Sequence, residues 1–359
     1  MNHEMIEIYS DFLITSFGQV SATNLEKALD AQISHDAITR FLSDRLLTSR
    51  DYWKLVKPVI RKVETETAFL ALDDFIVEKP DSEENASISY HYDHTQNRSV
   101  KGFNVVDVVY VNEEARVPLD FEMVLKSDYA FDPIQGKWRR TAFETKQELF
   151  RKMLLSAKAN NVLFKIVLAD TWFSSAENMI FIKFDLGKDF IFPIKTNRKV
   201  KLMNANQKPY QAVESLNLEE GIVYQARLEG VPFVVSLTKV IFKNEDASAG
   251  VLFLVSSLMD WSAAELIAGY HKRWRVEEQH KNLKQNASVG RSSGRCEMVR
   301  LNHLFCSFVG VLKLECMRLS IGLNPFALRA KLYLKALKAS MAELSTIRSE
   351  NAFSCFKPA

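Results

Sequence analysis

The segment YHKRWRVEEQHKNLK, residues 270–284, decides both the fold and the chemistry that this sequence predicts. Tyr270, Arg273, Glu277 and Lys284 lie in it at steps of three, four and seven residues. A helix turns by about 100° per residue, so these steps place the four side chains within an arc of roughly 60°. We therefore expect them to act together from one face of a helix.

This face would combine a phenol, a guanidinium, a carboxylate and an ammonium group. Glu277 can bind a hard divalent cation through oxygen, and Arg273 can hold phosphate through two parallel hydrogen bonds. The pattern thus favours metal-assisted chemistry on phosphate. A solvated helix face with an ion pair between Arg273 and Glu277 is the alternative interpretation. Val276 and Leu283 fall on another side of the helix, which predicts a separate buried edge.

The spacing Tyr-x2-Arg-x3-Glu-x6-Lys resembles the Y-R-E-K signature of IS4-family transposases. The resemblance implies that Glu277 is the last carboxylate of a DDE triad, whose two aspartates lie upstream at the ends of β-strands. It also implies that one helix carries the signature. We expect this helix over residues 261–285, with a break or kink near Gly269, because glycine is the weakest helix former in the run.

The first upstream aspartate is expected in TAFLALDD, residues 67–74, a β-like run that ends in Asp73 and Asp74. Acidic groups at the end of a buried strand are costly unless they are paired or bound to metal. The family pattern D-x-T or D-x-S favours Asp73. Phe75 stands where that pattern has a hydroxyl residue, so Asp74 remains the alternative.

The second aspartate is expected at the end of VLFKIVLAD, residues 162–170, an apolar run typical of a buried strand. The resemblance implies that Asp170 is the second member of the triad. An aspartate that merely caps the following helix is the alternative interpretation. Ser174 or Ser175 could provide that cap instead.

A strand, a hairpin, a helix and another strand follow one another before Asp170, which predicts an α/β fold with a mixed sheet. The resemblance implies an RNase H-like core that is interrupted by a β-rich insertion and flanked by α-helical N-terminal and C-terminal regions. The expected DNA-binding region is residues 1–62 and the first part of the core is residues 63–197. The insertion is expected at residues 198–257, and the second part of the core, with the Y-R-E-K helix, at residues 258–300. The C-terminal region is expected at residues 301–359.

The N-terminal region is predicted to hold two short helices. Thr23-x-x-Glu26 is typical of a capping box, and Ser34 can cap the second helix. Two such helices, with Arg40 and Arg45 on the second, resemble a DNA-binding helix-turn-helix. A small helical bundle with solvated arginines is the alternative.

Two further segments bear on the site. Thr141-x-x-Glu144 predicts a capping box for a helix that continues to residue 159. The polar stretch at residues 82–102 predicts a loop over the site. His91 and His94 lie in it, but no third ligand stands at zinc spacing, so a metal role for this pair is disfavoured.

The charge pattern favours DNA as a partner. The net charge is only +3, but residues 37–62 and residues 270–300 each carry a net charge of +5. Lys195 and Arg198 belong to a cation cluster that could line a DNA channel. A solvated basic loop is the alternative for that cluster.

The resemblance implies a transposase of an insertion sequence, which cuts at the element ends and joins them to target DNA. Two Mg²⁺ or Mn²⁺ ions would be held by Asp73, Asp170 and Glu277, while Tyr270, Arg273 and Lys284 would hold phosphates. The expected partners are terminal inverted repeats, target DNA and a second copy of the chain. An RNase H-like nuclease and a DNA-binding relic without catalysis are the alternatives. A glycosidase is disfavoured because cations flank the carboxylates.

The sequence predicts an intracellular protein of the cytoplasm, associated with the nucleoid when active, with no membrane partner. The cysteines lack CxxC spacing, so we expect reduced thiols at Cys296, Cys306, Cys316 and Cys355. No apolar run reaches about 18 residues, and the N-terminus has no signal-peptide core.

Overall fold

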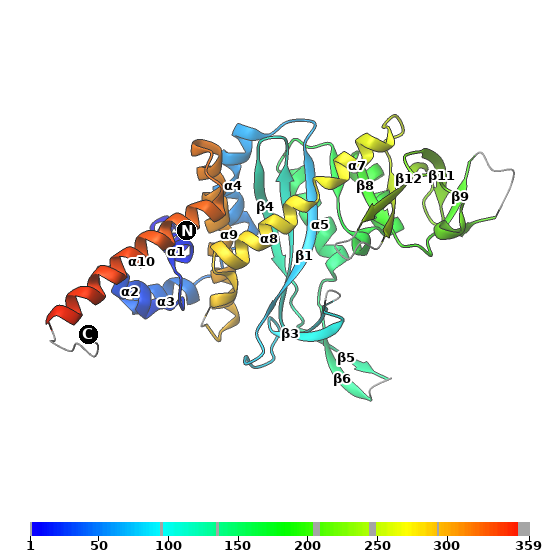
Figure 1. Ribbon diagram of the computed structural model, residues 1–359. Helices are drawn as coiled ribbons and strands as arrows, with labels where there is room; N and C mark the ends of the chain where they lie inside the picture. Colours follow the sequence, from blue (N-terminus) through cyan, green and yellow to red (C-terminus); the bar gives the residue numbers. More distant parts are fainter. Residues whose placement is uncertain are drawn as a thin grey trace, which may run out of the picture. The chain divides into compact units, whose positions relative to one another are not determined.

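The computed structural model describes residues 2–93, 96–133, 136–203, 209–243, 249–292 and 294–350. The chain divides into two compact units, and Figure 1 shows their helices and strands. The helical unit comprises Met1–Arg45, Asn282–Gly294 and Met298–Ala359. The sheet unit comprises Leu46–Lys281 and Arg295–Glu297.

A large mixed sheet organises the sheet unit, with the strand order β10-β9-β11-β12-β13-β8-β7-β1-β3-β2 and with β4 also paired to β3. A separate ribbon is formed by β5 and β6. The strands are β1 (Phe69–Glu78), β2 (Ser89–Asp93), β3 (Arg98–Val111), β4 (Arg116–Met123), β5 (Asp128–Asp132), β6 (Lys137–Thr141), β7 (Ile166–Leu168), β8 (Asp189–Ile194), β9 (Lys199–Leu202), β10 (Gln211–Ala212), β11 (Val223–Leu228), β12 (Val234–Lys243) and β13 (Ala249–Ser256).

The strands β4-β3-β1-β7-β8 form the RNase H-like core of this sheet. β1 is antiparallel to β3, and β3 is antiparallel to β4, whereas β7 is parallel to both β1 and β8. This arrangement confirms the predicted α/β fold with a mixed sheet. Because β1 and β7 run in the same direction, residues that follow them emerge at the same edge of the sheet.

The β-rich segment at residues 198–257 contains β9 to β13 and continues the same sheet. β13 joins it to the core by pairing antiparallel to β8, with Phe253 opposite Ile194. The backbone of β8 is therefore paired with neighbouring strands at both edges.

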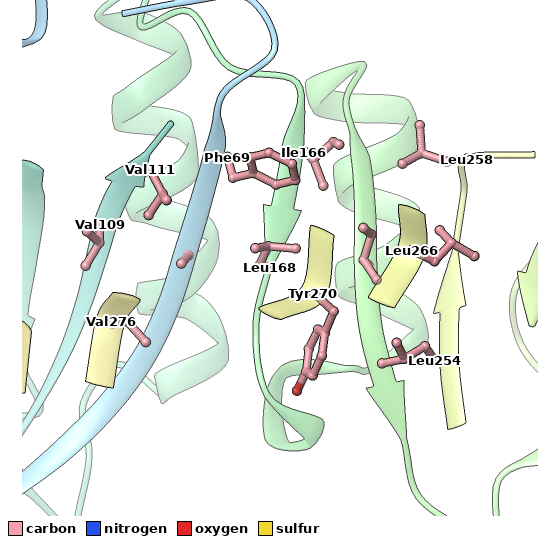
Figure 2. Close-up of a cluster of buried hydrophobic side chains, with 12 residues drawn as sticks. Phe69, Val109, Val111, Ile166, Leu168, Leu254, Leu258, Leu266, Tyr270 and Val276 are labelled. Carbon is pink, nitrogen blue, oxygen red and sulfur yellow. The ribbon is translucent and has the colours of Figure 1, made fainter. Parts of the chain in front are cut away.

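Helices surround the sheet within this unit. They are α4 (Ser49–Val63), α5 (Lys146–Ala159), α6 (Ala176–Ile180), α7 (Ala263–His271) and the first part of α8 (Trp274–Asn286), with a π-helical turn at Phe181–Leu186 and 3-10 turns at Thr171–Phe173 and Val213–Ser215. Apolar side chains of α7 and α8 pack against those of the central strands (Figure 2). Leu266, Tyr270 and Val276 meet Phe69 and Leu168 in this cluster. The burial fixes the two helices on the face of the sheet.

The break predicted near Gly269 is present but lies three residues later, at Lys272 and Arg273, so two helices, α7 and α8, stand in the predicted range of residues 261–285. The backbone bonds shorten from i+4 to i+3 there: the Arg273 N–H donates to the carbonyl of Tyr270 at 2.9 Å. Gly269 lies inside α7 and is not the break. A Cβ there would lie 2.8 Å from Ile191, so glycine permits close helix packing.

The loop predicted at residues 82–102 is confirmed only over residues 82–88, because β2 and the start of β3 pair as strands over residues 89–93 and 98–102. Backbone hydrogen bonds tie this segment to the rest of the sheet unit. The Lys79 N–H donates to the carbonyl of Lys101 at 2.8 Å, and the Ala86 carbonyl accepts from the N–H of Lys126 at 2.8 Å. His91 is buried on β2, and His94 lies outside the described residues. The β5–β6 ribbon was not predicted from the sequence.

Two predicted capping boxes are displaced. Helix α5 begins one turn after the predicted box, because Thr145 and Glu148 form the box and Thr141 ends β6. Helix α2 (Ala22–Ala28) is capped by Ser21 rather than Thr23. The carboxylate of Glu26 binds His35 instead, at 3.0 Å.

The helical unit is built from α1 (His3–Thr15), α2, α3 (His35–Ser43), the end of α8, most of α9 (Glu297–Ile321) and α10 (Pro325–Glu350), with a 3-10 turn at Val289–Arg291. Ser34 caps α3 as predicted. The Asn302 amide of α9 donates to the carbonyls of Leu42 at 2.9 Å and Arg45 at 2.8 Å, which ties α9 to the end of α3. The Tyr9 hydroxyl lies 3.0 Å from His303, which joins α1 to α9.

Cys296, Cys306 and Cys316 form no disulfide among the described residues, and Cys355 lies outside them. Burial raises the pKa of the Cys306 thiol, so this group stays protonated and inert. Within the described ranges, no helix combines the length and the apolar character that a membrane span needs.

Gly102 provides a test of strand packing. A Cβ at this position would lie 2.1 Å from the backbone oxygen of Val77, which cannot move without disturbing β1. We expect Gly102→Ala to lower the free energy of unfolding by about 2 kcal/mol or more, as measured by urea denaturation. Gly18 has no atom within 4 Å of such a Cβ, so Gly18→Ala is the control and should be nearly neutral. Equal stability of the two variants would contradict the close approach at Gly102.

Candidate active site

β1 carries Asp73 and Asp74 to opposite faces of the sheet, because neighbouring side chains alternate along a strand. Asp73 lies on the face of Phe69, which packs beneath α7. Asp74 lies on the other face, where one carboxylate oxygen accepts from Lys146 Nζ at 2.6 Å and from Asn104 Nδ2 at 2.7 Å. The two aspartates that the sequence left as alternatives thus have different surroundings.

Asp170 comes level with Asp73. The last residue pair of the parallel strands is Ala71 on β1 and Leu168 on β7, and Asp73 and Asp170 each come two residues later. One oxygen of Asp170 accepts the backbone N–H groups of Trp172 at 3.0 Å and Phe173 at 3.3 Å. Asp170 therefore caps a short 3-10 turn, while Ser175 caps α6. This capping uses only Oδ1, so it is compatible with a further role for the carboxylate.

The Arg273 guanidinium bridges two of the predicted carboxylates. Nη1 donates to Asp73 at 2.9 Å, and Nη2 donates to Glu277 at 2.7 Å. The Arg273 side chain is only 12% exposed and lies over the Tyr270 ring, 5.7 Å from its centroid. The break between α7 and α8 thus brings three residues of the Y-R-E-K spacing together with Asp73, although they do not share one helix.

Negative charge is crowded around Asp73. Burial and the nearby charge of Asp170 raise the pKa of Asp73 to about 7. The pKa of Asp170 is also raised, first by burial and then by the charge of Asp74. These carboxylates therefore need a neighbouring cation to stay ionised together.

A second buried network supports α8 and was not found from the sequence. Asp107 is the cross-strand partner of Asp73 and is fully buried. Its carboxylate accepts from His280 Nε2 at 2.6 Å and from the amide of Gln279. The His280 ring lies 4.5 Å from Phe75. The sequence signal for this contact is the carboxylate of Asp107 inside the apolar run VVDVVYV, residues 105–111. A buried acidic group requires a partner, which is His280 here.

The donor set is suited to a hard divalent cation. Asp73, Asp170 and Glu277 offer only oxygen, the ligand atom that Mg²⁺ and Mn²⁺ prefer. Among the described residues, no group of three or more His, Cys, Asp or Glu side chains is already assembled around a metal position. Arg273 lies between Asp73 and Glu277 and neutralises them, so the guanidinium would have to move for both to bind one ion.

The predicted basic residues Lys195 and Arg198 line an open cavity of about 350 Å³ that adjoins the turn after Asp170. Trp172 and Lys199 also line it. Arg198 is held in place by a 3.0 Å bond from Nη2 to a backbone carbonyl, and its Nε has no hydrogen-bond partner. The cavity is therefore polar, cationic and suited to an anion.

The helical unit carries the other predicted DNA contacts. Arg40, Arg45 and Lys284 are all exposed there. Arg40 lies on α3, where its Nε donates to the carbonyl of Asp36 at 3.4 Å. The exposure leaves these cations accessible to phosphate.

The RNase H-like sheet carries acidic side chains on β1, after β7 and on α8, an arrangement that is compatible with the nuclease class of protein. The chain belongs to the family described as DDE superfamily endonuclease, which matches residues 2–214. Residues 140–308 also match the family described as transposase DDE domain. Together these two matches support a DDE-type transposase or endonuclease and assign the chain at the level of the superfamily.

Solved structures add little to this assignment. The chain is similar to a chain of the Drosophila P element transposase strand transfer complex, with 11% sequence identity and a TM-score of 0.25. The similarity covers 58% of this chain and 40% of that chain. No curated protein matches the chain.

Removing the bridging guanidinium should expose the carboxylates. We expect Arg273→Ala to lower the free energy of unfolding by about 1 to 3 kcal/mol in EDTA, because buried acidic groups lose their partner. Mn²⁺ should then raise the melting temperature of this variant more than that of the parent protein.

Arg275→Ala is the matched control for that measurement. Arg275 pairs with Glu278 at 2.8 Å, and Glu278 keeps Arg116 as a second partner at 2.5 Å. A response to Mn²⁺ that is equal in both variants would contradict a cation site beneath Arg273.

Proposed function

We propose that this chain is the transposase of an insertion sequence of the IS4 type, which cuts DNA at the element ends and joins those ends to target DNA. One observation carries the proposal. Arg273 pairs with Asp73 and Glu277, while the parallel strands bring Asp170 level with Asp73. Three acidic residues that are far apart in sequence therefore share one region with a cation that can bind phosphate.

Asp73, Asp170 and Glu277 would hold two Mg²⁺ or Mn²⁺ ions. When bound, such ions activate water or a 3′-hydroxyl and stabilise the leaving oxygen in an in-line displacement at phosphorus. The crowding around Asp73 supports this assignment, because burial and Asp170 raise its pKa to about 7 and a divalent cation would offset both effects. Asp73 shares Arg273 with Glu277, whereas Asp74 lies on the other face of β1 and pairs with Lys146, which favours Asp73 as the ligand.

Arg273 would hold a backbone phosphate of the element end once it is released from the carboxylates. Tyr270 is largely buried, so its ring orients the guanidinium by stacking, and its hydroxyl lies at the edge of the apolar cluster (Figure 2). Lys284 is exposed and would add a phosphate contact from the end of α8. Three residues of the signature therefore position DNA, while Glu277 binds metal.

Further cations in each unit would hold the DNA. Lys195 and Arg198 line the cavity that adjoins Asp170 and would bind the strand backbone there. In the N-terminal region, residues 1–62, Arg40 and Arg45 would contact the inverted repeat. The β-rich segment at residues 198–257 would serve as an insertion in the catalytic core, between β8 and the Y-R-E-K helices.

Substitution of the acidic residues tests the assignment. On DNA that carries the chain's own genomic flanks, we expect Asp73→Asn, Asp170→Asn and Glu277→Gln each to lower Mg²⁺-dependent cleavage at least about 100-fold, because each removes a metal ligand. Binding of the same DNA in EDTA should persist, since cations supply it.

Asp74→Asn is the control, and its cleavage should stay within about tenfold of the parent protein. The reverse outcome, with Asp74 essential and Asp73 dispensable, would transfer the ligand role to Asp74. Gel analysis of joint molecules with a target plasmid separates a transposase from a nuclease. Cleavage without joining would favour the nuclease.

We also propose that the active form on DNA is a homodimer. Leu334, Leu337, Met341 and Leu344 of α10 are exposed and follow one another at three- and four-residue steps, the spacing of a coiled-coil seam. Exposed apolar side chains in such a row are costly in water. A second copy of α10 would cover them.

Charge placed in this row should disrupt the dimer. We expect Leu337→Glu with Met341→Glu to convert the DNA complex from two protein copies to one in analytical ultracentrifugation, because charge at a seam position opposes packing. Ala339→Glu, on the opposite side of α10, should leave the stoichiometry unchanged. A dimer that survives the double substitution must use another surface.

A further inference from the structure

The β5–β6 ribbon is separate from the large sheet, and most of the residues in its two strands are exposed. Figure 1 shows its two strands extending away from the sheet that includes β3. Its base is anchored, because the Phe143 N–H donates to Leu125 at 3.2 Å and Arg140 Nη1 donates to the carbonyl of Lys126 at 3.3 Å. A two-stranded ribbon gains little stability from its own backbone pairing. The stability of the fold therefore does not explain why this ribbon carries the side chains that it does.

One face of the ribbon is aromatic. Tyr129 pairs across the strands with Arg140, and Phe131 pairs with Trp138, which puts all four side chains on one face. The Arg140 guanidinium lies 4.8 Å from the centroid of the Tyr129 ring. The Phe131 and Trp138 rings are 5.8 Å apart and tilted by 66°. These contacts preorganise the face before any ligand binds.

The rings remain accessible to a partner. Tyr129, Phe131 and Trp138 are 56%, 52% and 68% exposed. Aromatic side chains stabilise a protein mainly when they are buried in a core. Three exposed rings on one narrow ribbon therefore contribute little to stability. Their arrangement indicates a binding surface.

The charges on β6 identify the kind of partner. The sequence KWRRT places Lys137, Arg139 and Arg140 within five residues around Trp138. Arg139 is paired with Asp132 at 3.1 Å on the opposite face. Arg140 belongs to the aromatic face, where its Nε lies 3.9 Å from the carboxylate of Glu84 outside the ribbon, so cations still outnumber acidic groups around the rings. Aromatic rings interleaved with cations fit the bases and phosphates of nucleic acid. Membership of a DDE endonuclease family makes that nucleic acid DNA.

Stacking further specifies the state of the DNA. A base can lie against Phe131 or Trp138 only when one of its own faces is open, which is not the case inside an intact duplex. We propose that the aromatic face of the β5–β6 ribbon binds unpaired DNA bases, such as those of a single strand freed beside a cut. The proposal rests on the DNA-processing role of the chain, but it does not require catalysis.

Binding measured without metal tests the ribbon separately from cleavage. The parent protein and its variants are titrated in EDTA into a fluorescein-labelled oligonucleotide of mixed sequence, either single-stranded or as a blunt duplex. Trp138→Ala and Phe131→Ala should each weaken single-strand binding at least about fivefold, the lower end of base stacking on an aromatic ring. Duplex binding should change little.

Two controls define the comparison. Trp138→Phe keeps an aromatic ring and should restore most of the single-strand affinity. Phe184→Ala removes a ring that is 62% exposed elsewhere in the sheet unit and should leave both affinities unchanged. Thermal melting followed by circular dichroism confirms that each variant is folded.

Three results would overturn the proposal. Unchanged single-strand binding in Trp138→Ala would remove the ribbon from DNA recognition. An equal loss for single strand and duplex would mean that charge, and not stacking, governs binding there. A change from dimer to monomer on sedimentation, with DNA affinity retained, would make the aromatic face a protein interface. Loss of cleavage in the acidic-site variants has no bearing on any of these results.

Discussion

The two ion pairs of Arg273 are the constraint on which the acidic region depends. Asp73 lies on β1 and Glu277 lies on α8, 204 residues later in the chain, and one guanidinium joins them. Without that positive charge, burial and Asp170 would oppose the ionisation of Asp73. The break between α7 and α8 belongs to the same arrangement, because it places Arg273 at the start of α8 and over the ring of Tyr270.

The parallel pairing of β1 and β7 supplies the other half of this arrangement. It puts Asp170 beside Asp73 with no direct bond between them, and the Trp172 and Phe173 amides hold the Asp170 carboxylate in place. On the neighbouring strand, Asp107 anchors His280 of α8. The helix is thus tied to the sheet by polar contacts on both sides of Val276, and apolar packing alone does not set its position.

The sequence predicted the elements whose signals are local. The α/β order, the strand before Asp170 and the Ser34 cap follow from short apolar runs and from residues next to them. The strand predicted to end at Asp73 and Asp74 continues to Glu78, so both aspartates lie inside β1. Gly269 indicated a break nearby, but the position of that break at Lys272 and Arg273 depends on partners far away in the chain. Thr141-x-x-Glu144 and Thr145-x-x-Glu148 are equivalent as capping boxes, and pairing of Thr141 with Asp128 in the ribbon decides between them. The roles of Asp73, Asp170 and Glu277 remain proposals.

The continuity of the sheet past β8 has a consequence for solubility. Phe190, Ile191 and Phe192 form a fully buried apolar strand, and β13 covers the side of it that does not face β7. Without residues 198–257, β8 would be an edge strand of the sheet. Its backbone N–H and C=O groups on that side would be unpaired, and its side chains are apolar. Such edges recruit strands from other molecules and lead to aggregation. Pairing with β13 therefore also protects the edge of β8 against the addition of strands from other molecules.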